Sequence, residues 1–166
     1  MRPSLASAGP PLAAAATIPL AAAGRQPLFF FGTLMDLDVL AYLLERPVDL
    51  DDLLPAEIAG FRRVRAARAS YPVLVPQPGA IVGGRLLRRA TARDIARINH
   101  YESGEYRAEL RTVTCFGRSV PAWLYLGLDG LEPSDEPWSL AEWQERSKPR
   151  FFAACDEWMA DYRGLR

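Results

Sequence analysis

The feature of the sequence that most constrains the fold is the segment 28–35, in which four apolar residues run directly into a Gly-Thr step. Residues 28–31 show no polar alternation, so they predict a strand that is buried on both faces. Gly32 has no Cβ, which lets the backbone turn sharply and lets another group come close. The amides of residues 33–35 would then lie between a strand end and a helix start, where free N–H groups suit an anion. The segment therefore predicts an anion-binding loop, with an ordinary structural turn as the alternative.

Length and charge limit the classes of protein to which the chain can belong. Its 166 residues suit one domain with a proper hydrophobic core. Lys plus Arg and Asp plus Glu both number 20, so the net charge is zero, which argues against a general nucleic-acid binder. No apolar run approaches the ~20 residues needed to span a membrane. We therefore expect a soluble protein that binds neither nucleic acid nor a membrane.

The cysteines and the histidine limit the chemistry in a similar way. Cys115 and Cys155 lie 40 positions apart and belong to no CxxC pattern, so a disulfide framework is not expected. A reducing compartment is the simpler interpretation, and we expect a cytoplasmic protein. Two scattered cysteines and the single His100 do not make a standard zinc site, so no metal and no cofactor are predicted.

The first 27 residues differ from the rest in composition. Residues 1–27 are rich in Ala and Pro and contain one weakly hydrophobic, Ala-rich core. This pattern resembles a secretory signal only faintly, because prolines interrupt it. We expect residues 1–27 to be a disordered or weakly signal-like leader, or an extension upstream of the true start, and residues 28–166 to form the folded domain.

Hydrophobic periodicity and turn residues divide the domain into short elements. Strand patterns cover residues 56–64, 71–76, 80–87, 110–115 and 120–126, the last two as a hairpin, and helix patterns cover residues 37–44, 91–101 and two stretches after Ser139 and Pro149. Pro78-Gly79 predicts a turn, Gly83-Gly84 a bulge or a close backbone approach, and residues 129–137 a loop. Because the elements do not alternate regularly, a doubly wound parallel sheet is disfavoured. The order predicts an α+β domain with a curled, mainly antiparallel sheet and flanking helices.

Glu102 is the strongest candidate for a residue that moves protons. It ends a predicted helix, next to Tyr101 and four residues before Tyr106. A carboxylate among aromatic rings loses solvation, which raises its pKa toward neutrality and allows it to accept and return a proton. The alternative is a surface glutamate beside a helix end. Glu105 and Glu109 are competing acids that we expect to be more exposed.

Two other groups of residues carry less functional promise. A nucleophile built from Cys115 and His100 is disfavoured, because nothing near Cys115 in the sequence would lower the pKa of its thiol. The basic stretch from Arg62 to Arg68 contains four arginines and could hold a phosphate, but a solvated strand edge is the more common structure for such a run.

Six short motifs occur in an order that resembles one known family. They are Phe-Gly-Thr-Leu at 31–34, Ala-Gly-Phe-Arg at 59–62, Tyr-Pro-Val-Leu at 71–74, Val-Gly-Gly-Arg-Leu at 82–86, Tyr-Glu-x-x-x-Tyr-Arg at 101–107 and Ala-Trp-Leu-Tyr at 122–125. Each motif alone is weak, but their joint order and spacing over residues 28–126 are specific. The chain resembles the γ-glutamylcyclotransferase-like proteins of the AIG2-like branch.

The resemblance implies a small α+β fold with a mainly antiparallel, barrel-like sheet and flanking helices. It also implies an enzyme that releases 5-oxoproline from a small γ-glutamyl amine or amino-acid conjugate, without cofactor or metal. Glu102 occupies the position of the family's proton acceptor. Phe31, Gly32, Thr33 and Leu34 occupy the loop that holds the γ-glutamyl head with backbone groups. Tyr106 and Tyr125 are expected to be pocket walls, with core packing as the alternative for each.

Two positions depart from the pattern of the family. Phe31 stands where a tyrosine is usual, so one hydroxyl is absent from the loop. Asn99 stands where an aspartate is usual, three residues before Glu102, so one charge is missing near the site. Neither change removes the proton acceptor. Both leave room for a different substrate, and the alternative function is a non-catalytic relative that keeps the pocket and binds a small molecule.

Overall fold

The computed structural model describes residues 9–127 and 130–165. The strands are β1 (Ala13–Ala15), β2 (Leu28–Phe30), β3 (Leu53–Ala66), β4 (Pro72–Leu87), β5 (Tyr106–Cys115), β6 (Arg118–Gly127) and β7 (Pro133–Pro137). The α-helices are α1 (Leu37–Leu44), α2 (Ala92–Glu102), α3 (Leu140–Arg146) and α4 (Lys148–Met159). Three single 3-10 turns are η1 (Leu20–Ala22), η2 (Thr33–Met35) and η3 (Leu50–Asp52).

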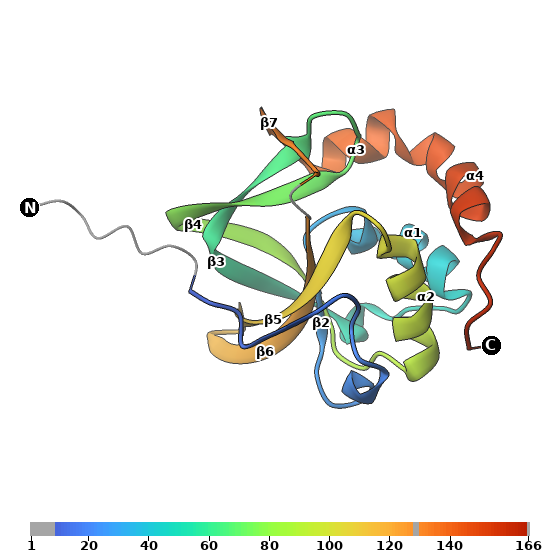
Figure 1. Cartoon of the computed structure of the whole chain (residues 1–166), viewed down its shortest axis with the longest axis horizontal. Helices are drawn as coiled ribbons and strands as arrows, with labels where there is room; N and C mark the ends of the chain where they lie inside the picture. The colour runs from blue at the N-terminus through green and yellow to red at the C-terminus, as the bar shows by residue number, and fades with distance from the viewer. Residues whose placement is uncertain (1–8, 128–129, 166) are drawn as a thin grey trace, which may run out of the picture.

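Five of the strands close into a barrel, with the helices gathered beside it (Figure 1). The strand order is β5-β6-β2-β4-β3, and a further pairing of β3 with β5, at Glu57 and Thr114, closes the ring. The β2–β6 pair is parallel and the other pairs are antiparallel. The predicted α+β fold with a mainly antiparallel, barrel-like sheet is confirmed.

Strand β2 lies at the centre of the molecule, as the uninterrupted apolar run predicts. Leu28 and Phe30 pack in the core between the barrel and the helices, and Phe29 and Phe31 pack in the second core, among strand side chains. All four side chains are at most 6% exposed, because side chains alternate between the two faces of a strand and both faces are covered here. The strand thus connects the barrel interior to the helical layer.

The pairing of β3 with β4 differs from the prediction in one respect. The sequence predicts a turn at Pro78-Gly79, but β4 continues through it as one strand, and the extra residues form a bulge opposite Gly60. Gly79 and Gly60 both have positive φ, 80° and 87°, which suits glycine.

The expected loop 129–137 also differs, because residues 133–137 form β7 against β3; residues 128 and 129 lie outside the described chain.

The predicted close backbone approach is present at Gly84. A Cβ placed there would lie 2.3 Å from the Phe30 carbonyl oxygen and 2.6 Å from the Phe29 ring. The absence of a side chain at Gly84 therefore lets β4 pair tightly with β2, the strand that leads into the loop 31–34.

The segment before β2 is folded, which corrects the expectation of a disordered or signal-like leader for its described part, residues 9–27. Strand β1 pairs with β5, and Ile18 and Ala22 are 1% and 3% exposed. The side-chain amide of Asn99, on α2, makes two hydrogen bonds to the backbone of Ile18, both 2.9 Å. These contacts join residues far apart in the chain, so the Ala-rich composition did not reveal them. Residues 1–8 lie outside the described residues.

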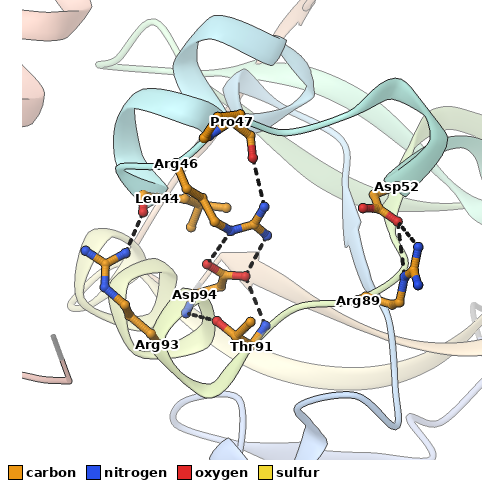
Figure 2. Close-up of polar contacts among 8 residues, drawn as sticks. All are labelled: Leu44, Arg46, Pro47, Asp52, Arg89, Thr91, Arg93 and Asp94. Atoms are coloured by element: carbon orange, nitrogen blue, oxygen red, sulfur yellow. Dashed lines mark hydrogen bonds and ion pairs between the residues drawn. The ribbon is translucent and has the colours of Figure 1, made fainter.

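Helices α1 and α2 are joined by ion pairs and a network of caps, part of which is drawn in Figure 2. The Arg46 guanidinium donates to both oxygens of Asp94, at 3.0 and 2.7 Å, just after α1 ends. Asp94 also accepts from the Thr91 amide, and Thr91 caps α2 in the predicted capping box. Arg93 donates to the Leu44 carbonyl at the end of α1. This network fixes the start of α2, whose other end carries Glu102.

The C-terminal helices pack against the body of the domain. Phe151 and Cys155 of α4 are 6% and 2% exposed, and the Phe151 ring contacts the rings of Trp143 and Tyr101. Across the described ranges, no helix has both the length and the apolar character that crossing a membrane requires.

Candidate active site

A pocket of about 400 Å³ lies where the end of β2 meets the ends of α2 and α4. Its walls come from Phe31, Thr33 and Leu34 of the predicted loop, from the Tyr71-Pro72 step, from residues 100–103 and 105–106, from Tyr125 of β6, and from Trp158 and Asp161. Six of the seven predicted site residues therefore line one cavity. Gly32 is the exception: its Cα faces Pro72, where an added Cβ would lie 3.0 Å from the proline ring.

Glu102 reaches this pocket because α2 ends there. Ser103 is the C-cap of the helix, and Gly104 has φ of 93°, which turns the chain back into β5. Burial raises the pKa of Glu102 to about 8, and the negative charge of Glu105 adds to this effect. A carboxyl group with such a pKa is mostly protonated at neutral pH but titrates just above it, so it can accept a proton and return it.

The loop after β2 forms the single turn η2, with Gly32 at its N-cap. The Met35 amide donates to the Gly32 carbonyl at 3.0 Å, so the prediction of three free amides is wrong for this residue. The amides of Thr33 and Leu34 belong to the first turn, where no acceptor exists within the helix. Behind the loop, Arg63 donates to the Phe31 carbonyl at 3.1 Å.

Tyrosines of the pocket are bound to neighbouring polar groups. The hydroxyls of Thr33 and Tyr101 share a hydrogen bond of 3.1 Å, which joins the loop to α2. The Tyr71 hydroxyl donates to Glu105, and the Tyr106 hydroxyl donates to the Pro72 carbonyl at 3.4 Å. Burial, together with the charge of Glu102, raises the pKa of Tyr101 and Tyr106, so both stay neutral at physiological pH.

Asn99 binds another tyrosine of the pocket, Tyr125. The Tyr125 hydroxyl donates to Asn99 Oδ1, which also accepts from the Ile18 amide, while Asn99 Nδ2 donates to the Ile18 carbonyl. An aspartate at this position would have no N–H to donate to that carbonyl. The asparagine side chain thus provides both the donor and the acceptor that bind the N-terminal segment at Ile18. Because the Tyr125 hydroxyl donates its proton to Asn99, its oxygen can still accept a hydrogen bond in the pocket.

Two further sequence-based expectations are corrected. Glu109, expected to be exposed, is 1% exposed: it lies opposite Leu124 of the second core, and Arg107 and Arg111 both pair with it. Arg63, expected at a solvated edge, is half-buried against the Phe31, Gly83 and Trp138 carbonyls.

The structure does not bring Cys115 and His100 together as a nucleophile and its base. Cys115 packs in the second core, where its thiol donates to the Pro55 carbonyl, whereas His100 lines the pocket. The His100 bonds go to the Trp158 carbonyl and to Asp161, at 3.1 and 3.0 Å.

Sequence reasoning did not assign several lining residues to the site. Tyr71 belongs to the Tyr-Pro-Val-Leu motif, but that motif alone does not indicate a place in the pocket wall. Trp158 follows Phe151 and Cys155 at helical spacing, which favours core packing, yet it is 50% exposed at the pocket. Asp161 follows α4 and has no pattern of its own. Only the tertiary docking of α4 brings these two residues to Glu102.

The arrangement combines a carboxyl group of raised pKa, a turn with amides at its start and a wall of aromatic rings. Among the described lining residues there is no lysine or arginine, so a bound carboxylate would have to rely on backbone N–H groups and hydroxyls. Such a site suits proton transfer on a small polar molecule.

Comparison with known proteins agrees with this picture. The sequence profile of the family described as gamma-glutamyl cyclotransferase, AIG2-like, matches residues 28–145. The chain is 26% identical to AIG2-like protein C of Arabidopsis thaliana over 140 residues, which cover 82% of this chain and 79% of that protein.

Solved structures show the same fold. The solution structure of an Arabidopsis thaliana protein has a TM-score of 0.58 at 22% identity, covering 85% of this chain and 95% of the other. A structure titled gamma-glutamyl cyclotransferase has a TM-score of 0.53 at 15% identity, covering 84% of this chain and 92% of that one. The profile match covers well over half of the sequence, and the chain therefore belongs to the gamma-glutamyl cyclotransferase, AIG2-like family.

Proposed function

We propose that the protein is a γ-glutamylcyclotransferase-type enzyme that releases 5-oxoproline from a small γ-glutamyl amine or amino-acid conjugate. The observation that carries the proposal is Glu102, whose pKa is raised to about 8 in the pocket that it shares with the loop 31–34. Family membership supports chemistry of the cyclotransferase type. The reaction needs no cofactor, because every proton it moves can pass through one carboxyl group.

In the proposed reaction, Glu102 takes a proton from the α-ammonium group of the substrate. The freed amine attacks the γ-carbonyl carbon and forms the new C–N bond of the five-membered ring. The protonated Glu102 then gives its proton to the nitrogen on the other side of that carbon, and the original amide C–N bond breaks. The ring nitrogen still carries one extra proton, which passes through the regenerated carboxylate to the departing amine, so the products are 5-oxoproline and the amine in its protonated form.

The loop would hold the substrate in the shape that this ring closure needs. The amides of Thr33 and Leu34 face no acceptor within η2, so they are available to the α-carboxylate of the substrate. The reaction is intramolecular, so holding a near-attack conformation supplies much of the rate enhancement. Tyr106 and Tyr125 would bound the pocket as neutral hydrogen-bonding walls.

The test is to incubate the purified protein with a panel of γ-glutamyl amines and γ-glutamyl amino acids and to quantify 5-oxoproline. We expect product from at least one compound, and a loss of about 100-fold or more in kcat for Glu102→Gln, the scale of a lost general base. Glu157→Gln is the matched control, since Glu157 is exposed on α4 and does not line the pocket.

Two results would overturn the proposal. Full activity of Glu102→Gln would remove the role of the carboxyl group. Binding of the same compounds by calorimetry, with no 5-oxoproline from any of them, would instead identify a binding protein that keeps the pocket.

A further inference from the structure

The mouth of the pocket carries negative charge that the proposed chemistry does not use. Besides Glu102, the ionisable carboxylates along the described walls are Glu105 and Asp161, and the one basic side chain is His100. We call Glu105, Trp158 and Asp161 the acidic rim. Glu105 precedes β5, and the other two come from the end of α4 and just beyond it, outside the residues that the family profile matches.

The rim lies at the open end of the pocket and the loop lies at the closed end. Phe31 and Thr33 are 6% and 8% exposed, whereas Trp158 is 50% exposed and the Asp161 side chain 84%. With the γ-glutamyl head held by the buried loop, the amine on the other side of the scissile bond extends toward the mouth. The rim is therefore the surface that the leaving amine meets.

Hydrogen bonds fix the rim and leave it rich in acceptors. His100 Nε2 lies 3.1 Å from the Trp158 carbonyl oxygen and 3.0 Å from Asp161 Oδ1; both are acceptors, so this nitrogen carries a proton and ties the rim to α2. The Tyr71 hydroxyl donates to Glu105, which leaves the Tyr71 oxygen as an acceptor. The Trp158 ring, 6.0 Å from the Tyr101 ring, adds an aromatic face, which attracts cations.

We propose that the rim selects γ-glutamyl conjugates whose leaving amine carries a second, protonated amino group and no carboxylate, such as conjugates of diamines. The inference rests on the proposed function and names its substrate class. The γ-glutamyl head is a zwitterion of zero net charge, so the leaving part sets the charge of the substrate. A carboxylate there would face the rim carboxylates, whereas an ammonium group would gain attraction from them and from Trp158.

The experiment compares three conjugates of similar length that differ in the terminal group of the leaving amine. They are γ-glutamyl-1,4-diaminobutane, which ends in an ammonium group, γ-glutamyl-pentylamine, which ends in a methyl group, and γ-glutamyl-4-aminobutyrate, which ends in a carboxylate. We expect kcat/KM for the cationic conjugate to exceed that of the neutral one by roughly fivefold and that of the anionic one by more. The advantage should shrink as salt is added, because the rim is exposed.

Two rim variants assign the preference to these residues. Asp161→Asn and Trp158→Leu should each lower the cationic-to-neutral ratio of kcat/KM by about two- to fivefold. The control is Glu157→Gln, which removes one negative charge as Asp161→Asn does. Glu157 lies on α4 and does not line the pocket, so this variant should leave the ratio unchanged. Circular dichroism and the melting temperature of each variant separate loss of selectivity from loss of folding.

The outcomes distinguish this inference from the function on which it rests. Release of 5-oxoproline from all three conjugates at equal kcat/KM, or a preference for the anionic one, overturns the rim's role and leaves the cyclotransferase intact. Absence of 5-oxoproline from all three overturns the proposed function for this class. Calorimetric binding of the same compounds then still tests the rim: tighter binding of the cationic conjugate supports it, and equal or weaker binding contradicts it.

Discussion

Glu102 owes its chemical character to its surroundings more than to any partner. Burial raises its pKa, with the nearby Glu105 charge as the second cause, and no cation is among the causes to lower it. A carboxyl group that holds its proton in the folded state affects stability as well as catalysis, because folding and proton binding are linked.

Replacing this residue should therefore change how stability depends on pH. Between the ordinary value of 4.5 and about 8, the folded protein keeps a proton on Glu102 that the unfolded chain has lost. The free energy of unfolding of the wild type should thus fall across this window relative to Glu102→Gln, whose amide does not titrate. Urea titrations of both proteins from pH 4 to 9 measure the difference. A difference that does not vary with pH would contradict a raised pKa.

Asn99 provides a second prediction at the scale of one residue. Asn99→Asp keeps an acceptor for the Ile18 amide and for Tyr125 but removes the donor to the Ile18 carbonyl. An unpaired carbonyl facing a carboxylate should cost about 1–3 kcal/mol at neutral pH. The cost should shrink in acid, where the new carboxyl group regains a proton to donate. Tyr125→Phe serves as the control that removes one hydroxyl alone, and equal stability of Asn99→Asp and wild type at pH 7 would contradict the account.

Strands β2 and β4 lie so close together at Gly84 that no side chain fits between them. A Cβ at Gly84 would lie 2.3 Å from the Phe30 carbonyl, and a backbone atom in a buried strand cannot move aside at low cost. Gly84→Ala should destabilise the fold by about 1–3 kcal/mol or more. Gly83→Ala is the matched control, because a Cβ there meets nothing within 4 Å. Similar melting temperatures for the two variants would contradict the close approach.

Besides their apolar contacts, the C-terminal helices are bound to one buried carboxylate, that of Asp36. Burial would raise the pKa of Asp36, but hydrogen bonds from Lys148, Gln144 and the Val39 amide outweigh burial and hold the pKa below its usual range. Lys148, the only lysine of the chain, also contacts Asp38, whose side chain is 76% exposed.

Removal of this lysine should loosen the attachment of α4. Lys148→Met should cost about 1–3 kcal/mol, since a charged hydrogen bond to the buried Asp36 is lost. Asp38→Asn removes the exposed partner and should change stability by less than about 1 kcal/mol. Hydrogen exchange of α4 amides should rise in the first variant and not in the second. Unchanged exchange in both would show that α4 is held by its apolar contacts alone.

At the scale of the whole molecule, local patterns predicted the parts and long-range pairing decided their arrangement. The apolar run 28–31, the Thr91–Asp94 capping box and the hairpin of β5 and β6 were predictable because each depends on neighbours in sequence. The docking of residues 9–27 was not, because its contacts lie far away on α2 and β5.

The same division applies to the pocket. Glu102 and the loop 31–34 carried motifs, so the sequence located them. Trp158 and Asp161 join them only because α4 packs over the end of α2. Burial of Glu109 had a partial signal in the period-2 spacing of Arg107, Glu109 and Arg111 on one strand, but the core residue opposite it, Leu124, is brought there only by strand pairing.

The most direct test of the account is the pH dependence of 5-oxoproline release by the wild type and by Glu105→Gln. A base must be ionised to act, so kcat/KM should rise with pH through about 8 in the wild type. Loss of the Glu105 charge removes one cause of the raised pKa, so the rise should move to lower pH in the variant, while the titration of the substrate amine stays the same. An identical profile for both proteins, or activity that does not rise toward pH 8, would contradict Glu102 as the group that moves the proton.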